Sequence, residues 1–337
     1  MPFSKYILIF AFILFISCKN NLDVDISDIE VKQLNALSLN KDFFSLTDAN
    51  FSSKNKDFQL KYGPFYNNYV KSFLNPLGVN DSSSKDSIIH FISDKTMQQA
   101  NNQVNKIYTN DVLNYLSNEV TNCVKRFKYH FKSKSIPNRF ITCTSGFNFY
   151  IASSDSALIT GLDMYLGDTS VFYKMLQLPE YQTRCMRQEY VLPDLMRGWI
   201  LTEFDNENPI NNLLNHTIFY GKLYYAVNCM LPNLNDSLII GYTQNQLNYC
   251  KKFEKNLWGY FAEKNRLYEN NMKTVQELTT EGPFTAAISK DCPPRIAMWV
   301  GWQIVKSYMK ENETVTLEQL MNEKDAQKIL SKSKYRP

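Results

Sequence analysis

The sequence predicts an α+β fold, mostly helical with a small central sheet, and three observations support this class. Apolar residues recur at three- and four-residue steps from residue 86 to about residue 134, which is a helical period. Over residues 138–165 the period shortens to that of strands. After residue 170 the helical period returns and continues almost to the end of the chain. Helices and strands are therefore grouped rather than alternating, which favours α+β over α/β.

The first 17 residues are typical of a signal peptide. Lys5 is the only charge before an apolar run from Tyr6 to Ile16, and Ser17 and Cys18 follow directly. As a helix the run would be about 16 Å long, which is too short to span a bilayer. A cysteine at this point predicts a lipoprotein, cut before Cys18 and carrying acyl chains such as palmitate on that thiol. An ordinary signal peptide or a plain N-terminal anchor is the alternative.

Two or more acyl chains hold a protein stably on a membrane. We therefore expect a periplasm-facing domain that is lipid-anchored in a bacterial cell envelope. Residues 18–40 are polar and predict a flexible tether, and residues 41–337 a single domain with a helical half to about residue 135, a sheet over 138–165 and a second helical half. No second segment approaches the roughly 20 apolar residues of a membrane span.

Composition predicts a large core and excludes one class of partner. The chain is 44% hydrophobic and 14% aromatic. Removing Lys5 lowers the formal net charge from +4 to +3, which is too weak and dispersed to suggest nucleic acid. Six cysteines remain after Cys18 is assigned to lipid, and without a C-x-x-C pair they predict buried thiols rather than a zinc or redox motif, although disulfides stay possible in an exported protein. They are Cys123, Cys143, Cys185, Cys229, Cys250 and Cys292.

The local patterns place the elements in order. Residues 140–143 and 147–151, separated by Ser145 and Gly146, predict a β-hairpin, and residues 157–162 a third strand. The last helix before the sheet has an apolar stripe made of Val112, Leu116, Val120, Cys123, Val124, Phe127 and Phe131. Later helices are expected at 171–177, 180–204, 209–230, 243–268, 294–311 and 317–332.

The helix that starts at Pro294 is the most distinctive of these. Two prolines fix the chain just before it, where a missing N–H costs little. Residues 296–305 are apolar nearly all round, so this helix should be buried, with Gly301 allowing a close neighbour. Arg295 stands where the helix dipole favours an anion, and we expect it to pair with a carboxylate. That pairing is either structural or part of a binding site.

The motifs of common hydrolases are missing. The histidines are His90, His130 and His216, and no two are four residues apart as a zinc helix requires. The chain has neither a G-x-S-x-G elbow nor a phosphate-binding glycine loop. Acidic residues between Asp163 and Asp205 could form an acid–base pair, but solvated helix faces are the commoner explanation. The tryptophans are expected in the core rather than in a sugar platform, and they are Trp199, Trp258, Trp299 and Trp302.

A series of segments in the second part of the chain points to a family. The segments are 158–167, 178–181, 221–224, 231–232, 283–284, 294–295, 299–305 and 329–337. In this order they resemble the GldB family of gliding-motility lipoproteins. The resemblance implies a component needed for surface gliding in Bacteroidetes-type bacteria, where gliding is coupled to a dedicated secretion apparatus. It implies no cofactor and no established enzyme activity, with other envelope proteins of that machinery as partners.

The resemblance also implies a distant likeness to zincin-type predicted peptidases. In those proteins an H-E-x-x-H helix follows a sheet-edge strand, and a glutamate on the next helix completes the zinc site. On this chain the plan places Gln188, Glu189 and Leu192 at the zinc helix and Tyr220 at the third ligand. Leucine cannot bind a metal and glutamine is a poor ligand, so the implied metal site is degenerate.

Three functions follow as hypotheses. The leading one is a non-enzymatic pseudo-zincin scaffold or binding domain, which docks another envelope protein or a peptide in the former substrate cleft. The first alternative is an envelope hydrolase or peptidase with an atypical site around Glu189, His216 and Asp194. The second is a lipoprotein that binds glycan or cell wall through aromatic side chains.

Overall fold

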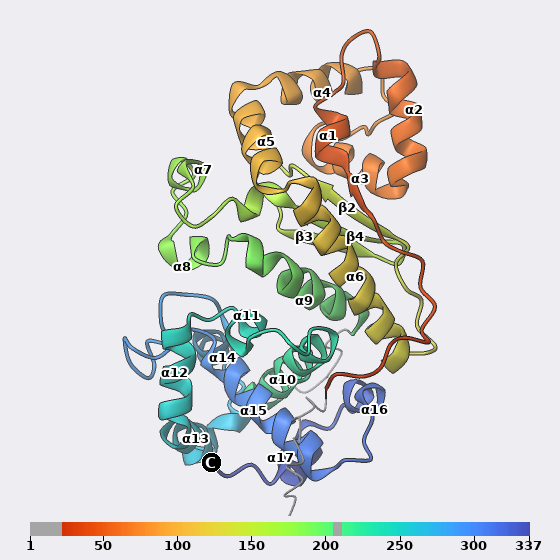
Figure 1. Ribbon diagram of the computed structural model, residues 1–337. Coiled ribbons are helices and arrows are strands. Elements are labelled where there is room, and N and C mark those ends of the chain that lie inside the picture. Colours follow the sequence, from red (N-terminus) through yellow and green to blue (C-terminus); the bar gives the residue numbers. More distant parts are fainter. Residues whose placement is uncertain (1–21, 205–210) are drawn as a thin grey trace, which may run out of the picture.

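The computed structural model describes residues 22–204 and 211–337, and it confirms a mostly helical α+β fold with a small sheet (Figure 1). The predicted signal peptide, Cys18 and the first residues of the predicted tether lie outside the described residues, as do 209 and 210 of a predicted helix. In the described ranges, no helix combines the length and the apolar character needed to span a membrane.

The N-terminal half packs helices around one end of the sheet, at the top of Figure 1. Its elements are β1 (Ala36–Ser38), α1 (Leu39–Phe43), α2 (Phe51–Tyr62), α3 (Pro64–Phe73), α4 (Ser84–Ser93), α5 (Lys95–Ile107) and α6 (Asn110–His130). The segment predicted as tether reaches into this half, because Leu34 and Leu39 are buried and β1 pairs with the sheet. The predicted stripe of α6 is buried from Leu116 onward, and Val112 is half-buried.

The sheet has the strand order β1-β2-β4-β3, with β2 (Arg139–Cys143), β3 (Ile151–Ser154) and β4 (Ala157–Gly161). Both β1 and β4 run parallel to β2, and β3 is an antiparallel edge strand beside β4. The predicted hairpin of residues 140–143 and 147–151 is therefore wrong. The hairpin that forms joins β3 to β4 through Asp155 and Ser156.

A buried carboxylate explains the difference. Asp163 is fully buried, and its oxygens accept hydrogen bonds from the backbone N–H groups of Ser145 (2.7 Å) and Phe147 (2.6 Å). These bonds hold residues 145–147 in a tight turn, with Gly146 and Phe147 at positive φ. Backbone groups bound to a side chain cannot join a strand ladder, so the pairing starts only at Ile151.

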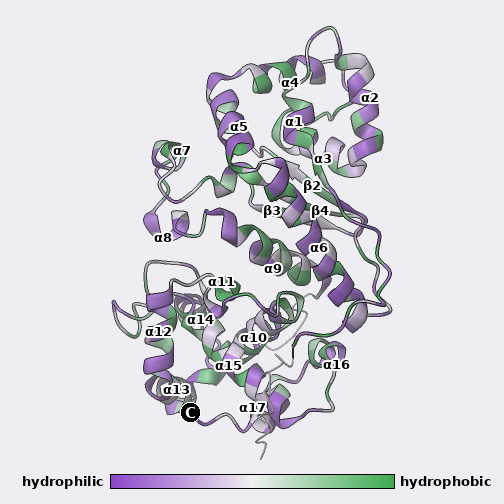
Figure 2. Cartoon of the chain, in the orientation of Figure 1, coloured by the Kyte–Doolittle hydropathy of each residue, from purple (hydrophilic) through white to green (hydrophobic). Residues whose placement is uncertain are grey.

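The sheet separates two cores. Phe140 and Leu158 face the larger core, whereas Ile141 and Ile159 face a smaller core under α1–α4, as the two-residue period of strands requires. Every residue of β4 is buried, which is expected of a strand covered on both faces. The outer helices are different in character, and α2 is largely hydrophilic in Figure 2.

The C-terminal half contains the remaining elements. They are the 3₁₀ helix η1 (Leu162–Tyr165), α7 (Val171–Met175), α8 (Glu180–Thr183), η2 (Gln188–Tyr190), α9 (Val191–Glu203), α10 (Leu213–Met230), α11 (Asp236–Ile240), α12 (Gln244–Lys252), α13 (Glu254–Ala262), η3 (Glu263–Tyr268), α14 (Met272–Thr279), α15 (Ile296–Glu311), α16 (Leu317–Asn322) and α17 (Ala326–Ser333). The helices predicted at 180–204, 243–268 and 317–332 are each divided into shorter pieces, and α11 and α14 were not predicted.

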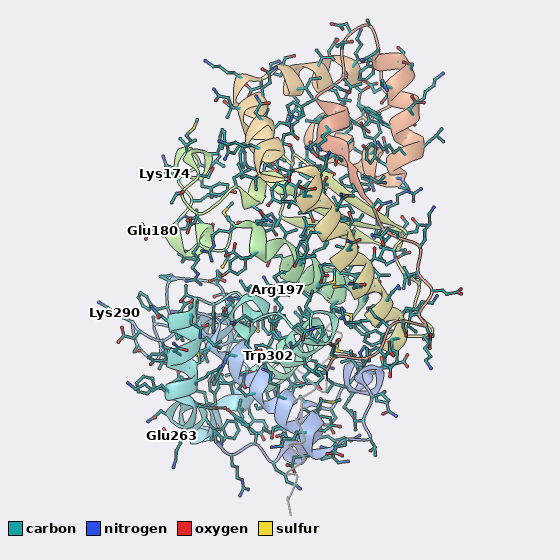
Figure 3. All side chains as sticks on the ribbon, in the orientation of Figure 1. Lys174, Glu180, Arg197, Glu263, Lys290 and Trp302 are labelled. Atoms are coloured by element: carbon teal, nitrogen blue, oxygen red, sulfur yellow. The ribbon has the colours of Figure 1, made fainter. Side chains whose placement is uncertain are left out.

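Helix α15 is the buried helix that the sequence predicts. Trp299 and Trp302 are 1% and 0% exposed, and Figure 3 places Trp302 among the helices of the C-terminal half. Trp199 on α9 is buried as well, and Trp258 is half-buried against Tyr335. A glycan platform built from Trp199, Trp299 and Trp302 is therefore not available on the surface.

Helices α10 and α15 touch through their backbones. A Cβ atom added at Gly221 of α10 would clash with the carbonyl group of Gly301 on α15, and one added at Gly301 would clash with the carbonyl oxygen of Thr217. Two side chains of any size would push the axes apart, so this crossing requires both glycines.

We predict that Gly301→Ala lowers the free energy of unfolding by about 1–3 kcal/mol, because the added methyl group meets a backbone carbonyl that cannot rotate away. Gly259→Ala on α13 is the matched control, since nothing lies within 4 Å of a Cβ at that position. The control should stabilise the helix slightly, by up to about 1 kcal/mol. Urea denaturation measures both, and equal stability of the two variants would contradict the contact.

Lys222, beside Gly221, ties α16 to α10. Its buried ammonium donates to the carbonyl oxygens of Met321 (3.1 Å) and Glu323 (2.8 Å). A cation at a helix C-terminus is electrostatically favourable. Burial nevertheless lowers the pKa of Lys222 to about 8.

This shift predicts a pH dependence of stability. Between pH 8 and 10.5 the unfolded chain holds a proton on this lysine that the folded chain has released, so the free energy of unfolding rises with pH. The rise is about 3 kcal/mol relative to Lys222→Met, which has no such proton. Urea denaturation of both proteins across this range measures the difference. A constant difference would show that burial does not shift this group.

Candidate functional site

A cleft of about 500 Å³ opens between the edge strand β3 and the helices of the C-terminal half. One face of α9 lines it through Asp194, Arg197, Gly198 and Leu201, which are spaced as one helical face requires. A Cβ atom at Gly198 would clash with Ile151 of β3, so this glycine lets α9 lie close against the sheet edge. A larger hollow of about 1390 Å³ is lined by Leu22, by Tyr129 and His130 at the end of α6, and by residues of α10, α15 and α16.

Helix α10 and the segment before α15 form the opposite wall. Tyr220, Leu223 and Tyr224 come from α10, and Arg295 is the residue directly before α15. Arg295 has a φ of 57°, a left-handed backbone conformation that is uncommon outside glycine. Arg295 lies between the two prolines and the first turn of α15. Because its backbone belongs to the start of that helix, the position of α15 determines where the guanidinium lies.

Two arginines meet at the C-terminal end of α11. Arg197 donates to the carbonyl oxygens of Leu238 (3.3 Å) and Ile239 (2.6 Å), and Arg295 donates to those of Ile240 (3.0 Å) and Gly241 (3.2 Å). Free carbonyls at a helix end carry partial negative charge and attract cations. The terminal carbonyls of α11 therefore hold two like charges side by side at the cleft wall, and Figure 3 shows Arg197 between α9 and the C-terminal helices.

Two carboxylates balance this pair, and they are held differently. Asp194 contacts Arg197 and accepts a hydrogen bond from the Tyr165 hydroxyl (2.8 Å). Glu281 comes from the loop between α14 and α15 and lies 2.8 Å from Nε of Arg295. The expectation that Arg295 pairs with a carboxylate is thus met. The Asp194 side chain is 15% exposed and that of Glu281 39%, so Glu281 is the less firmly enclosed.

The surroundings shift the pKa values of the two guanidinium groups in opposite directions. Burial lowers the pKa of Arg197, and the charge of Arg295 lowers it further. Burial also opposes the charge on Arg295, but Tyr224 and Glu281 outweigh it and raise the pKa of that group. Arg295 also donates to the Tyr224 hydroxyl (3.1 Å). Both groups stay protonated, so the cleft offers fixed positive charge and tyrosine hydroxyls.

The described lining of the cleft presents charged groups, tyrosine hydroxyls and one thiol. Cys185 is among the lining residues, but its thiol donates to the carbonyl of Gly241 (3.6 Å), and the described lining includes no histidine that could act as its base. The carboxylates of Asp194 and Glu281 are each paired with an arginine.

The positions at which the zincin plan places metal ligands lie on three different elements. Gln188 and Glu189 belong to η2, and α9 begins only at Val191, with Pro193 accommodated in its first turn. Leu192 is buried in the large core, and Tyr220 lines the cleft. Gln188 is exposed and Leu192 is buried, so their side chains do not face one site. Across residues 22–204 and 211–337, no three His, Cys, Asp or Glu side chains gather as a metal site would need.

The residues of the atypical-hydrolase hypothesis are not brought together. Glu189 is exposed and forms an ion pair with Arg187 (2.9 Å). His216 is hydrogen-bonded to Asn211 (2.6 Å), and burial lowers its pKa. Of the three candidates, only Asp194 is a lining residue of the cleft.

Sequence reasoning missed Arg197 and Glu281. An arginine within a helix usually lies on the surface, and Glu281 stands in a loop with no pattern around it. One signal was present, since Asp194 and Arg197 are the only charged residues in the stretch from Val191 to Ile200 and stand three residues apart. Charged residues in an apolar run are expected to be paired.

Residues 19–337 match the model of a protein family described as gliding motility protein GldB. The match covers nearly the whole chain, and it starts directly after Cys18. No match was found among curated proteins or among solved structures.

Proposed function

The chain belongs to the gliding motility protein GldB family, and we propose that it is a non-enzymatic, membrane-tethered component of the gliding machinery and its associated secretion apparatus. In this proposal the cleft docks a peptide or a segment of another envelope protein. The observation that carries it is the cleft itself, whose buried arginine pair and tyrosines present binding groups without a nucleophile and base.

The anchor is the first part of the proposal. Cys18 follows the apolar run and Ser17 at the point where a lipoprotein is cut, and the family match begins one residue later. Acyl chains on Cys18 would tether the domain to an envelope membrane facing the periplasm.

We predict that Cys18→Ser abolishes incorporation of radiolabelled palmitate and leaves the precursor unprocessed, so that it migrates as the longer chain on a gel. A single serine removes the thiol that is acylated and leaves the apolar run intact. Cys123→Ser is the control, because Cys123 is buried in the core and should not influence labelling. Undiminished labelling of Cys18→Ser would contradict the assignment.

The absence of catalysis is the second part. A zinc peptidase needs a water-activating glutamate between two imidazole ligands. The residues of α9 that face the cleft four positions apart are Asp194 with Gly198 and Arg197 with Leu201. Neither pair supplies two nitrogen ligands, which supports a pseudoenzyme over the hydrolase.

Docking in the cleft can be tested in gliding cells. We predict that a photoreactive phenylalanine analogue at Leu201, a 45% exposed lining residue, crosslinks to one dominant envelope protein. Leu60 on α2 is the control, because it is 80% exposed and far from the cleft. Mass spectrometry identifies the product. Products that are absent, or identical at both positions, would contradict docking there.

A further inference from the structure

We infer that the cleft recognises a carboxylate group of its partner at Arg295, and that Glu281 occupies this position in the free protein. The inference rests on the proposed docking function and names the chemistry that the cleft would bind. The cleft contains two ion pairs, Arg197 with Asp194 and Arg295 with Glu281, and they are held unequally.

Arg197 and Asp194 form a closed unit. Arg197 contacts Asp194 and two carbonyl oxygens of α11, and the second carboxylate oxygen of Asp194 is bound to Tyr165. A ligand that displaced Asp194 would leave its half-buried carboxylate and the buried Tyr165 hydroxyl without their partners. Buried polar groups that lose their partners carry a large penalty, so this half of the cleft is fixed.

Arg295 is held on one side only. Its two terminal nitrogens donate to Tyr224 and to the carbonyls of α11, which positions the guanidinium firmly. Its Nε is buried and lies 2.8 Å from Glu281, yet this N–H is not aligned for a hydrogen bond. Glu281 therefore balances the charge at the edge of the guanidinium that carries Nε, but the Nε–H group there makes no hydrogen bond. A carboxylate binding that edge with two parallel hydrogen bonds would satisfy it better.

Glu281 is the group that can leave. It is the most exposed of the four charged residues, and it stands in an exposed loop directly before Gly282 and Pro283. Its other oxygen is 3.4 Å from Arg184, a long contact. When Glu281 swings into water, Arg184 and Arg295 are left without their carboxylate, so the cleft attracts a negative group. Water can hydrate the released carboxylate of Glu281, which keeps the free-energy cost of the exchange low.

The cleft has room for more than the carboxylate. Its volume of about 500 Å³ fits a few residues of a peptide, and Leu201, Leu223 and Met298 give it apolar surface beside the charged end. The carboxylate can be a chain terminus or an aspartate or glutamate side chain. Both offer the same two oxygens to the guanidinium edge, and the experiment below separates them.

The test measures binding of random octapeptides to the full mature protein in three pools. One pool has free C-termini and no Asp or Glu, the second has amidated C-termini with Asp and Glu, and the third is amidated without acidic residues. We expect binding from the first or the second pool and none from the third. Which of the two binds identifies the source of the carboxylate.

The variant Glu281→Gln removes the internal competitor and keeps the shape of the side chain. It should tighten binding about tenfold, because an occupied site lowers apparent affinity in proportion to its occupancy. Glu277→Gln is the matched control, since Glu277 is exposed on α14 and does not line the cleft. Arg295→Lys keeps the charge but loses the second donor and should weaken binding about tenfold, with the melting temperature measured to exclude unfolding.

Equal binding of all three pools, no binding at all, or an unchanged affinity of Glu281→Gln would overturn the inference. These results differ from a failure of the proposed function. If the Leu201 crosslink to one envelope protein persists in cells while no pool shows carboxylate dependence, docking stands and the carboxylate site falls. If the crosslink is absent as well, both are rejected.

Discussion

The backbone contact between α10 and α15 is the constraint on which the C-terminal half depends. Gly221 and Gly301 allow the two helices to meet without intervening side chains, and the carbonyl of Thr217 packs where a Cβ would otherwise be. Because α15 is buried on every side, its tryptophans anchor neighbouring helices at the same time. If the axes of α10 and α15 move apart, the many dispersion contacts between closely packed side chains weaken together. One methyl group added at this crossing therefore destabilises packing across the C-terminal half.

The same crossing determines the shape of the cleft. Helix α10 presents Tyr220 and Tyr224 to the cleft on one side and Gly221 to α15 on another. Helix α15 starts at Arg295, so the position of its axis decides where the guanidinium meets the carbonyls of α11. On the opposite wall Gly198 brings α9 against β3. Three glycines, Gly198, Gly221 and Gly301, therefore position the side chains that line the cleft.

Residue patterns predicted what depends on periodicity. The spacing of apolar residues was enough to predict the fold class, the apolar stripe of α6 and the buried α15. A helix that is apolar all round, such as the first part of α15, is expected to be buried. The pairing of strands could not be predicted in this way. Residues 147–151 have the composition of a strand, but Asp163 binds the backbone before them, and that contact comes from residues 16 and 18 positions away in sequence. The long predicted helices also broke into pieces. Within the helix predicted at 317–332, for example, Asp325 caps the start of α17.

The candidate site could not be predicted from residue spacing either, because its contacts also join residues far apart in the sequence. Arg295 could be marked because its position before a helix demanded a carboxylate, but nothing in the sequence connects it with Glu281, α11 or Arg197. The arrangement makes physical sense only in three dimensions. Two buried guanidinium groups would repel each other, and the terminal carbonyls of a short helix and two carboxylates offset that repulsion. A protein that only needed stability could place apolar side chains there at lower cost. Retaining two arginines at the wall of an open cleft, one of them neutralised by an exposed loop, is the arrangement expected where the charge is kept for a ligand.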